Sequence, residues 1–271
     1  MKRYHALFLI CILCSMGQES LADNLWEEVV TIGGVEIGHK NHNLDEMFDS
    51  PLNFYMLSAN ITAAYKNYYL GAHIARSIAE TSISEDGETG EAERSDLDVV
   101  LGWNINNNVT LFTGYKKGKT ELNMRTREIE GIFEDIQVSF NSRFELAGPY
   151  LGGAYTFRFA EQSQLTLSFA YAWLEANNHL ESGSDIDIEE LEDLEDLLDF
   201  DDLETKSRND AQGYSIGKKW TAPITNNLYY TALFRFNKYE QKIRGELGGF
   251  SRTFKVDERF IDMNFGVIYV F

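Results

Sequence analysis

The sequence predicts an all-β protein, a single antiparallel up-and-down barrel that crosses a membrane with its strands. Three observations lead to this fold class. Segments in which apolar and polar residues alternate recur along the chain, and a period of two is typical of β-strands. Short turns and long polar loops follow one another between these segments. The last segment ends at the terminus with no tail over its edge, and closure of a barrel within lipid removes such an edge.

The first residues have the composition of a secretory signal peptide. Lys2 and Arg3 precede an apolar run over 6–16, and small residues lead to Ala22. The apolar run is too short to span a bilayer as a helix. We therefore predict a signal peptide over 1–22, which is removed from the mature chain.

The predicted mature chain, 23–271, is long enough for one barrel domain. It has no cysteine, because Cys11 and Cys14 both lie in the predicted signal peptide, and this excludes disulfides and thiolate metal sites. The formal charge of −19 argues against nucleic acid as a partner. No apolar run after the signal peptide is long enough for a spanning helix, so strands must make any membrane crossing.

Ten alternating segments are expected as strands. The first is the weakest, because its apolar residues flank a Gly-Gly pair. If this segment and one neighbour fail to pair, the alternative is a barrel of eight strands. In chain order the segments are 26–37, 54–65, 68–78, 96–104, 109–116, 149–159, 164–174, 212–221, 228–237 and 260–271.

The terminal strand carries the sharpest motif. Counted back from the end in steps of two, its residues are aromatic or apolar. In this it resembles Gram-negative outer-membrane β-barrels, whose last strand ends in Phe with aromatics at alternating positions before it. The resemblance implies that Phe271, Tyr269 and Phe265 form a signal for the barrel-assembly machinery. It also implies a place in the outer membrane, with lipid and lipopolysaccharide as partners, and it selects no subfamily.

Loop lengths orient the barrel. Bacterial barrels have an even number of strands, short periplasmic turns and long outer loops. The short connections are 66–67, 105–108, 160–163 and 222–227, and the long polar connections are 38–53, 79–95, 117–148, 175–211 and 238–259. This strict succession places both chain ends on the periplasmic side.

Alternation also assigns the two faces of the wall. The residues expected to face lipid are Leu97, Leu101, Leu111, Leu151, Leu167, Phe169, Ala232, Phe234, Phe265 and Val267, with girdle aromatics Trp103, Tyr115, Phe159, Trp173, Trp220 and Phe271. The ionisable residues expected to face the lumen are His73, Asp96, Asp98, Lys116, Arg158, Lys219, Arg235 and Asp262.

Two luminal charge pairs are predicted from register. The turn at 105–108 brings Asp98 opposite Lys116, and the last hairpin brings Arg235 opposite Asp262. Opposed side chains on one face of a strand pair lie within contact distance. We therefore expect two cross-strand ion pairs that obstruct the bore and form a packed salt-bridge core. The alternative is a continuous polar conduit.

The longest loop contains an acidic stretch over 185–204 with no Lys or Arg. Leucines at three- and four-residue spacing suggest a short helix, which repulsion between the carboxylates opposes. The pattern of a calcium-binding loop is missing, so charge alone predicts loose attraction of divalent cations. Its first six carboxylates are those of Asp185, Asp187, Glu189, Glu190, Glu192 and Asp193.

Hydrolase signals are weak. Ten-stranded omptin-type proteases use acidic pairs with an Asp-His pair near the rim, and Asp96 with Asp98 resembles only the acidic part. Lipid-cleaving barrels use an outward Ser and His. The candidates for that arrangement are His73 with Ser77 and His179 with Ser182. Neither lies in a motif that supplies a base and an orienting group. His39 and His42 are interpreted as ordinary loop residues.

The sequence thus favours a non-enzymatic barrel in the cell outer membrane. It would serve envelope structure or bind an unknown outside partner through its acidic loops. Two other functions stay open, a narrow porin-like pore or carrier for small solutes and, less favoured, a rim hydrolase. No catalytic residue, cofactor or specific metal site is assigned.

Overall fold

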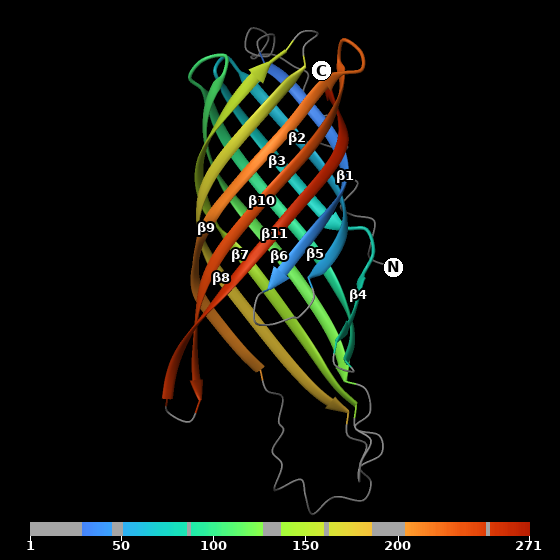
Figure 1. Ribbon diagram of the computed structural model, residues 1–271, viewed down its shortest axis with the longest axis vertical. Helices are drawn as coiled ribbons and strands as arrows, with labels where there is room; N and C mark the ends of the chain where they lie inside the picture. The colour runs from blue at the N-terminus through green and yellow to red at the C-terminus, as the bar shows by residue number, and fades with distance from the viewer. Residues whose placement is uncertain are drawn as a thin grey trace, which may run out of the picture.

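A computed structural model shows a closed antiparallel barrel with strongly tilted strands (Figure 1). It describes residues 29–44, 51–85, 88–126, 137–159, 163–185, 204–247 and 250–271. The predicted signal peptide and most of the acidic stretch therefore lie outside the described residues. No helix in the described part of the chain is long and apolar enough to cross a membrane.

The described chain forms eleven strands. Their bounds are β1 Val29–Leu44, β2 Leu52–Tyr65, β3 Tyr68–Ser77, β4 Thr81–Glu85, β5 Glu88–Asn104, β6 Val109–Thr126, β7 Gln137–Arg158, β8 Gln164–Asp185, β9 Glu204–Pro223, β10 Leu228–Leu247 and β11 Phe250–Val270.

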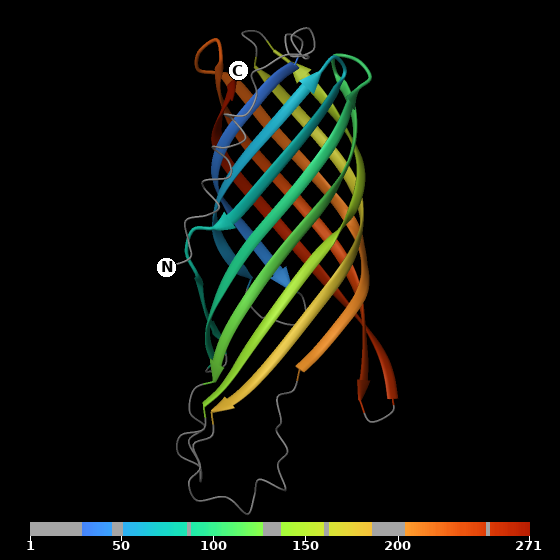
Figure 2. The same cartoon turned by 180° about the vertical axis from the view of Figure 1, so that it is seen from behind.

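Ten of these strands close the barrel. Consecutive strands pair antiparallel, β1 pairs with β11, and β3 pairs with β5 to complete the circle. The short β4 is an extra strand that pairs only with β5 and continues the wall beyond the end of β3 (Figure 2). Ten strands are thereby confirmed over eight, and the weak first segment pairs along both of its edges.

The described short connections lie at the end of the barrel where the chain terminates (Figure 1). Lys66, with φ 53°, makes the two-residue turn between β2 and β3. In the turn after β5, the amide of Ile105 donates to the carbonyl of Val109 at 3.0 Å. The loop lengths predict that this end is periplasmic, and it is called the periplasmic end from here on.

An apolar band covers the outer face next to the turns. Exposed large side chains from every barrel strand make it, and nine predicted lipid-facing residues are among them: Leu97, Leu101, Leu111, Leu151, Leu167, Phe169, Phe234, Phe265 and Val267. The predicted girdle residues Trp103, Tyr115, Phe159, Trp173 and Phe271 are exposed as well. At the periplasmic edge Trp220 donates to the hydroxyl of Tyr230 at 3.0 Å and packs against Phe159.

The strands continue far past this band, which corrects the prediction of five long loops. The β8 strand has 22 residues, about 70 Å along its axis, whereas the hydrocarbon layer is about 30 Å thick. Beyond Trp173 its outward residues are polar, beginning with Glu175 and Asn177. The alternation of hydrophobicity thus ends at the membrane edge, but the backbone ladder does not.

The core of the molecule is the outer half of the lumen. One buried apolar cluster lies on β1, β2, β4, β5 and β6, and includes Leu44, Phe54 and Leu122. A second lies on β7 to β11, and includes Leu174, Tyr239 and Phe260. Burial of such side chains stabilises the fold by about 1.5–3 kcal/mol each. These clusters leave a narrow space between them for the charged residues of the lumen.

Candidate functional site in the barrel lumen

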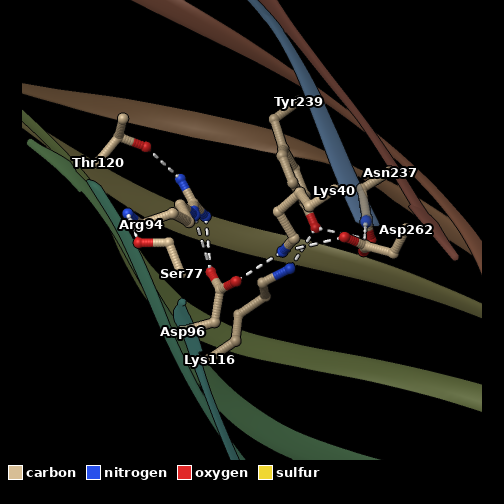
Figure 3. A network of polar contacts seen from close by, with 9 residues as sticks. All are labelled: Lys40, Ser77, Arg94, Asp96, Lys116, Thr120, Asn237, Tyr239 and Asp262. Carbon is tan, nitrogen blue, oxygen red and sulfur yellow. Dashed lines mark hydrogen bonds and ion pairs between the residues drawn. The ribbon is translucent and has the colours of Figure 1, made fainter. Parts of the chain in front are cut away.

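A buried ionic network crosses the lumen just beyond the membrane band (Figure 3). At its centre Asp96 of β5 accepts hydrogen bonds from Lys40 Nζ of β1 at 2.6 Å and from Arg94 Nη2 at 2.7 Å. The Lys40 ammonium also lies 3.1 Å from the carboxylate of Asp262 on β11. Lys40 and Asp262 are register partners on the adjacent strands β1 and β11, and Asp96 reaches Lys40 from β5, so alternating charges tie β5 to this strand pair.

Arg94 fills the rest of the space beside Asp96. Its Nη1 donates to Thr120 Oγ1 at 2.7 Å, and its backbone amide donates to Ser77 Oγ at 3.1 Å. Its guanidinium lies 4.7 Å from the ring centre of Phe260, a favourable cation–π distance. The Arg94 side chain is only 6 % exposed. Because its charge is matched and its donors are used, burial of this arginine is tolerated.

A second arm of the network runs through neutral groups. Lys116 Nζ donates to the hydroxyl of Tyr239 at 2.5 Å, and that hydroxyl donates to Asn237 Oδ1 at 3.2 Å. Asn237 Nδ2 in turn donates to Asp262 Oδ2 at 3.2 Å. Lys116 thus reaches Asp262 through two intermediates, and the two arms close on the same carboxylate (Figure 3).

The predicted ion pairs had the right register but the wrong partners. Asp98 stands opposite Lys116, and Arg235 stands opposite Asp262. Within the described residues neither pair approaches to 4.0 Å. Asp98 instead accepts a hydrogen bond from the Tyr150 hydroxyl at 2.5 Å. Because long side chains lean along and across a narrow bore, Asp98 and Lys116 find partners on strands that are not neighbours. Asp262 instead pairs with Lys40 on the adjacent strand β1.

Lys40 and Arg94 were missed because they fall in segments predicted as loops. The signal that could have identified them is the alternation of side-chain direction along each strand. Lys40 is two residues beyond Gly38 and four beyond Glu36, which faces the lumen, and Arg94 is two before Asp96. Continuing the inward alternation past the apolar band would have placed both residues in the lumen.

A further polar layer covers the network on its outer side. Glu258 is 1 % exposed and accepts a hydrogen bond from Gln241 Nε2 at 2.7 Å. His42 stacks on Phe260 with a ring separation of 4.1 Å. Among the described side chains, Glu258 Oε2 and both ring nitrogens of His42 lack a hydrogen-bond partner. Glu258 lies past the band, between outward-facing Asp257 and Arg259.

Burial raises the pKa of Glu258 to about 7, although Arg94, Gln241 and Lys116 act in the opposite direction. Because the folded-state pKa exceeds the value of 4.5 for an unperturbed glutamate, the folded state holds the proton more tightly. The stabilisation is complete below pH 4.5 and is lost as the pH rises through 7, a change of about 3 kcal/mol. Glu258→Gln should remove this part of the pH dependence of unfolding by urea in lipid vesicles.

Glu145→Gln is the matched control for Glu258→Gln. Glu145 lies on the outer surface and pairs with Lys117 at 2.8 Å, where solvent screens the interaction. Its substitution should leave the pH dependence of the unfolding free energy as in the wild type. A Glu258→Gln variant that kept the full wild-type slope between pH 5 and 8 would contradict the assignment.

A cavity of about 420 Å³ lies in the lumen on the periplasmic side of the network. The network residues Lys40, Arg94, Asp96 and Asp262 line one end of it, and Thr110 and Thr166 line the other. The two threonines are near the periplasmic starts of β6 and β8. The lumen is thus packed in its outer half and hollow in its periplasmic half. This arrangement is intermediate between the two predictions, a packed salt-bridge core and a continuous polar conduit.

The hydrolase candidates lie in different surroundings. His73 faces the lumen and stands opposite Asp98 in the β3–β5 pairing, and Ser77 donates no bond to it but accepts from the Arg94 amide. His179 stands on the outward face of β8, and the side chain of Ser182 lies outside the described residues. No group of three or more His, Cys, Asp or Glu in the described part of the chain is placed to hold a metal ion.

The remaining predicted residues are placed as follows. Phe265 and Tyr269 face outward on β11, Phe271 is exposed directly after its end, and the Tyr269 and Phe271 rings lie 4.9 Å apart. Asp185 ends β8, and the other acidic-loop carboxylates, those of Asp187, Glu189, Glu190, Glu192 and Asp193, lie outside the described residues. Arg158 is exposed near the periplasmic rim, and Lys219 lines the cavity.

Comparison with known proteins supports the fold but does not identify a specific function. No family model matches the sequence, and no curated protein does. Among solved structures, the outer membrane protease OmpT from Escherichia coli is similar with a TM-score of 0.55 and 12 % identity, over 94 % of this chain and 99 % of that chain.

Two autotransporter domains are less similar. The beta domain of the Bordetella autotransporter BrkA has a TM-score of 0.48 and 10 % identity, over 90 % of this chain and 100 % of that chain. The translocator domain of NalP from Neisseria meningitidis has a TM-score of 0.46 and 10 % identity, over 89 % and 88 %. The similarity to the OmpT structure confirms, at the level of architecture, the resemblance that the terminal strand predicted: the chain is a closed, ten-stranded barrel with the fold of outer-membrane proteins.

Proposed function

We propose that this protein is a non-enzymatic outer-membrane barrel that serves envelope structure or surface interaction, with its lumen closed at the outer end. The observation that carries the proposal is the network around Asp96. It joins β1, β5 and β11 across the bore, between two buried apolar clusters. Because the charges match each other, the plug is stable without an external counterion.

The outward surface beyond the membrane band fits a role in contact with other molecules. It carries exposed ion pairs of mixed sign, such as Arg143 with Glu121 at 3.2 Å and Lys238 with Asp257 at 2.6 Å. Exposed pairs of this kind contribute little to stability. They do make the outward face of the extended wall polar, which suits a barrel whose wall projects beyond the membrane.

The luminal carboxylates favour the non-enzymatic proposal. Asp96 is held by two cations, and Asp98 accepts a short hydrogen bond from Tyr150. A general base must be within reach of a substrate proton and free to accept it. In this arrangement Asp96 is engaged at the centre of the plug, and Asp98 is engaged beside it in the lumen.

The cavity favours a second candidate function, a carrier for a small solute. Single-channel recording in planar bilayers separates the two. A closed barrel should show no steady conductance, and Arg94→Ala combined with Asp96→Ala should raise conductance by removing a matched pair from the plug. Steady conductance of the wild-type protein would overturn the closed-lumen proposal and favour the carrier.

The proposal includes the export and assembly of the chain. Residues 1–22 would direct secretion, and the terminal aromatics would be recognised by the assembly machinery. Phe271 is 75 % exposed, and its amide donates to the carbonyl of Thr31 at 2.9 Å. The side chain therefore adds little to the packing of the finished barrel.

Deletion of Phe271 should reduce the yield of folded barrel in membranes much more than it reduces stability in detergent. The expected loss of unfolding free energy is about 1 kcal/mol or less, because the ring is mostly exposed. The comparison is heat-modifiable mobility of the membrane fraction against urea unfolding of the refolded variant. Phe159→Ala, which removes an exposed aromatic at the same edge, should spare the yield. Equal effects of the two changes on yield would remove the special role of Phe271.

A further inference from the structure

The cavity differs in charge from the rest of the molecule. Lys117 touches it but pairs with Glu145 on the outer face. The other charged lining residues are five bases, Lys40, Arg94, Lys116, Lys219 and Arg235, and four acids, Glu36, Asp96, Asp98 and Asp262. A chain with a formal charge of −19 therefore encloses a pocket with an excess of positive charge. Low-dielectric walls focus the field of such a pocket on anions.

Among the described basic residues that line the cavity, Arg235 stands out because no hydrogen bond or close ion pair engages its side chain. It extends from β10 into the lumen, opposite Asp262 on β11 and Gly217 on β9. Within the described part of the chain its guanidinium makes no hydrogen bond and no ion pair within 4.0 Å. Asp98 and Asp262 act on it through their fields only. A guanidinium is always charged and has five N–H donors, so an enclosed one without acceptors is costly.

The acids near Arg235 are already served by other donors. Asp98 accepts from Tyr150, and Asp262 accepts from Asn237 while it pairs with Lys40. Glu36 accepts from Thr231 Oγ1 at 3.3 Å. None of these carboxylates needs Arg235, so the arginine donors are left for a group that enters the cavity.

Lys219 supplies a second available cation close by. It is the next inward residue after Gly217 on β9 and stands opposite Leu233. Its nearest carboxylate is Glu36, at 3.9 Å, which is longer than a charge-assisted hydrogen bond. The Lys219 side chain is 38 % exposed. Gly217 has no side chain, and the hydroxyl of Ser168, which also lines the cavity, occupies the space where its Cβ would lie.

The same cavity also offers apolar surface, which could contact the apolar part of a ligand. Phe112, Leu233 and Val100 line it together with small residues such as Ala154 and Ala170. A volume of about 420 Å³ falls in the range of ligand pockets, roughly 300–1,000 Å³. The cavity thus combines an apolar wall with a few convergent polar groups, as small-molecule sites do.

We propose that the luminal cavity binds a small organic anion, a carboxylate or phosphate monoester with an apolar body, which enters from the periplasmic end. Arg235 donates a forked pair of hydrogen bonds to the anionic group, and Lys219 adds a second charge. Phe112 and Leu233 contact the apolar body. This site goes beyond the proposed surface function and does not depend on it.

The test is calorimetric titration of the refolded full mature chain in a maltoside detergent, which carries no charge. The probes are benzoate and phenyl phosphate, with benzamide as the neutral analogue of the same shape as benzoate. At least one anion should bind saturably, and benzamide should bind at least about tenfold more weakly because it lacks the charge. Absence of binding by both anions, or equal binding of benzamide, would overturn the site.

Substitutions locate the binding. Arg235→Gln should weaken the anion by at least about tenfold, and Lys219→Gln by at least about threefold. Arg76→Gln is the control, because Arg76 lies on the outer surface and pairs with Glu93 at 2.9 Å. Heat-modifiable mobility verifies folding, and Lys219→Gln decides the question if Arg235→Gln does not fold. Unchanged affinity in a folded variant would reject the site while leaving the conductance result untouched.

Discussion

Phe169→Arg is expected to lower the unfolding free energy of the barrel in lipid vesicles by about 2–4 kcal/mol. Phe169 is 54 % exposed on the outer face. It is the middle one of five outward apolar or aromatic residues on β8, from Leu165 to Trp173. A guanidinium there must either lose its water near the bilayer midplane or draw water and headgroups toward itself. Urea titration followed by tryptophan fluorescence measures the loss.

Asn177→Arg on the same strand is the matched control for Phe169→Arg. Asn177 also faces outward, two positions past Glu175 and beyond the apolar band. The new arginine would stay in water and should change the unfolding free energy by less than about 1 kcal/mol. If both substitutions cost the same, β8 would not have Phe169 near the middle of the membrane.

The barrel itself was predictable because membrane strands repeat one simple rule. In the terminal strand, Phe265, Val267 and Tyr269 alternate with residues that face the lumen. Short turns then fix the register of each hairpin. For that reason the pairing of Asp98 with Lys116 across the turn at 105–108 could be predicted residue by residue. The pairing of Arg235 with Asp262 followed instead from the centre of the connection predicted over 238–259.

The extent of the strands could not be predicted from the same signal. Past Trp173 or Tyr115, neither face contacts lipid, and the alternation of hydrophobicity stops. The hydrogen-bonded ladder needs no hydrophobic residues and continues, as the pairing of β7 with β8 as far as Asp185 shows. The extra strand β4 was hidden in a segment of this kind, in which the buried apolar residues Ile83 and Ala92 are nine positions apart.

The choice of partners in the site was beyond sequence reasoning for a different reason. Register defines which residues are neighbours on adjacent strands, but a closed barrel also brings opposite walls together. Lys40 on β1 meets Asp96 on β5, and Lys116 on β6 meets Tyr239 on β10. These contacts depend on the bore and tilt of the barrel, which the alternation pattern does not contain.

Asp96→Asn is expected to destabilise the barrel by about 3–5 kcal/mol, because it removes the carboxylate on which Lys40 and Arg94 converge. The Asp96 side chain is 17 % exposed, and those of Lys40 and Arg94 are 13 % and 6 % exposed. Asparagine keeps the shape and part of the hydrogen bonding, so the loss measures the uncompensated buried charge. Urea unfolding in neutral lipid vesicles gives the free energy.

Glu93→Gln, on the same strand, is the control for Asp96→Asn. Glu93 faces outward and pairs with Arg76, whose side chain is 72 % exposed, so its loss should cost less than about 1 kcal/mol. The sharper check is the cycle that combines Asp96→Asn with Lys40→Met. Once the aspartate charge is gone, removing the lysine also removes its repulsion with Arg94. The double variant should therefore lose less than the sum of the single losses, by about 0.5–3 kcal/mol. Simple addition of the two single losses would mean that Lys40 and Asp96 do not act as one unit, and the plug would then be a packed core with incidental charges.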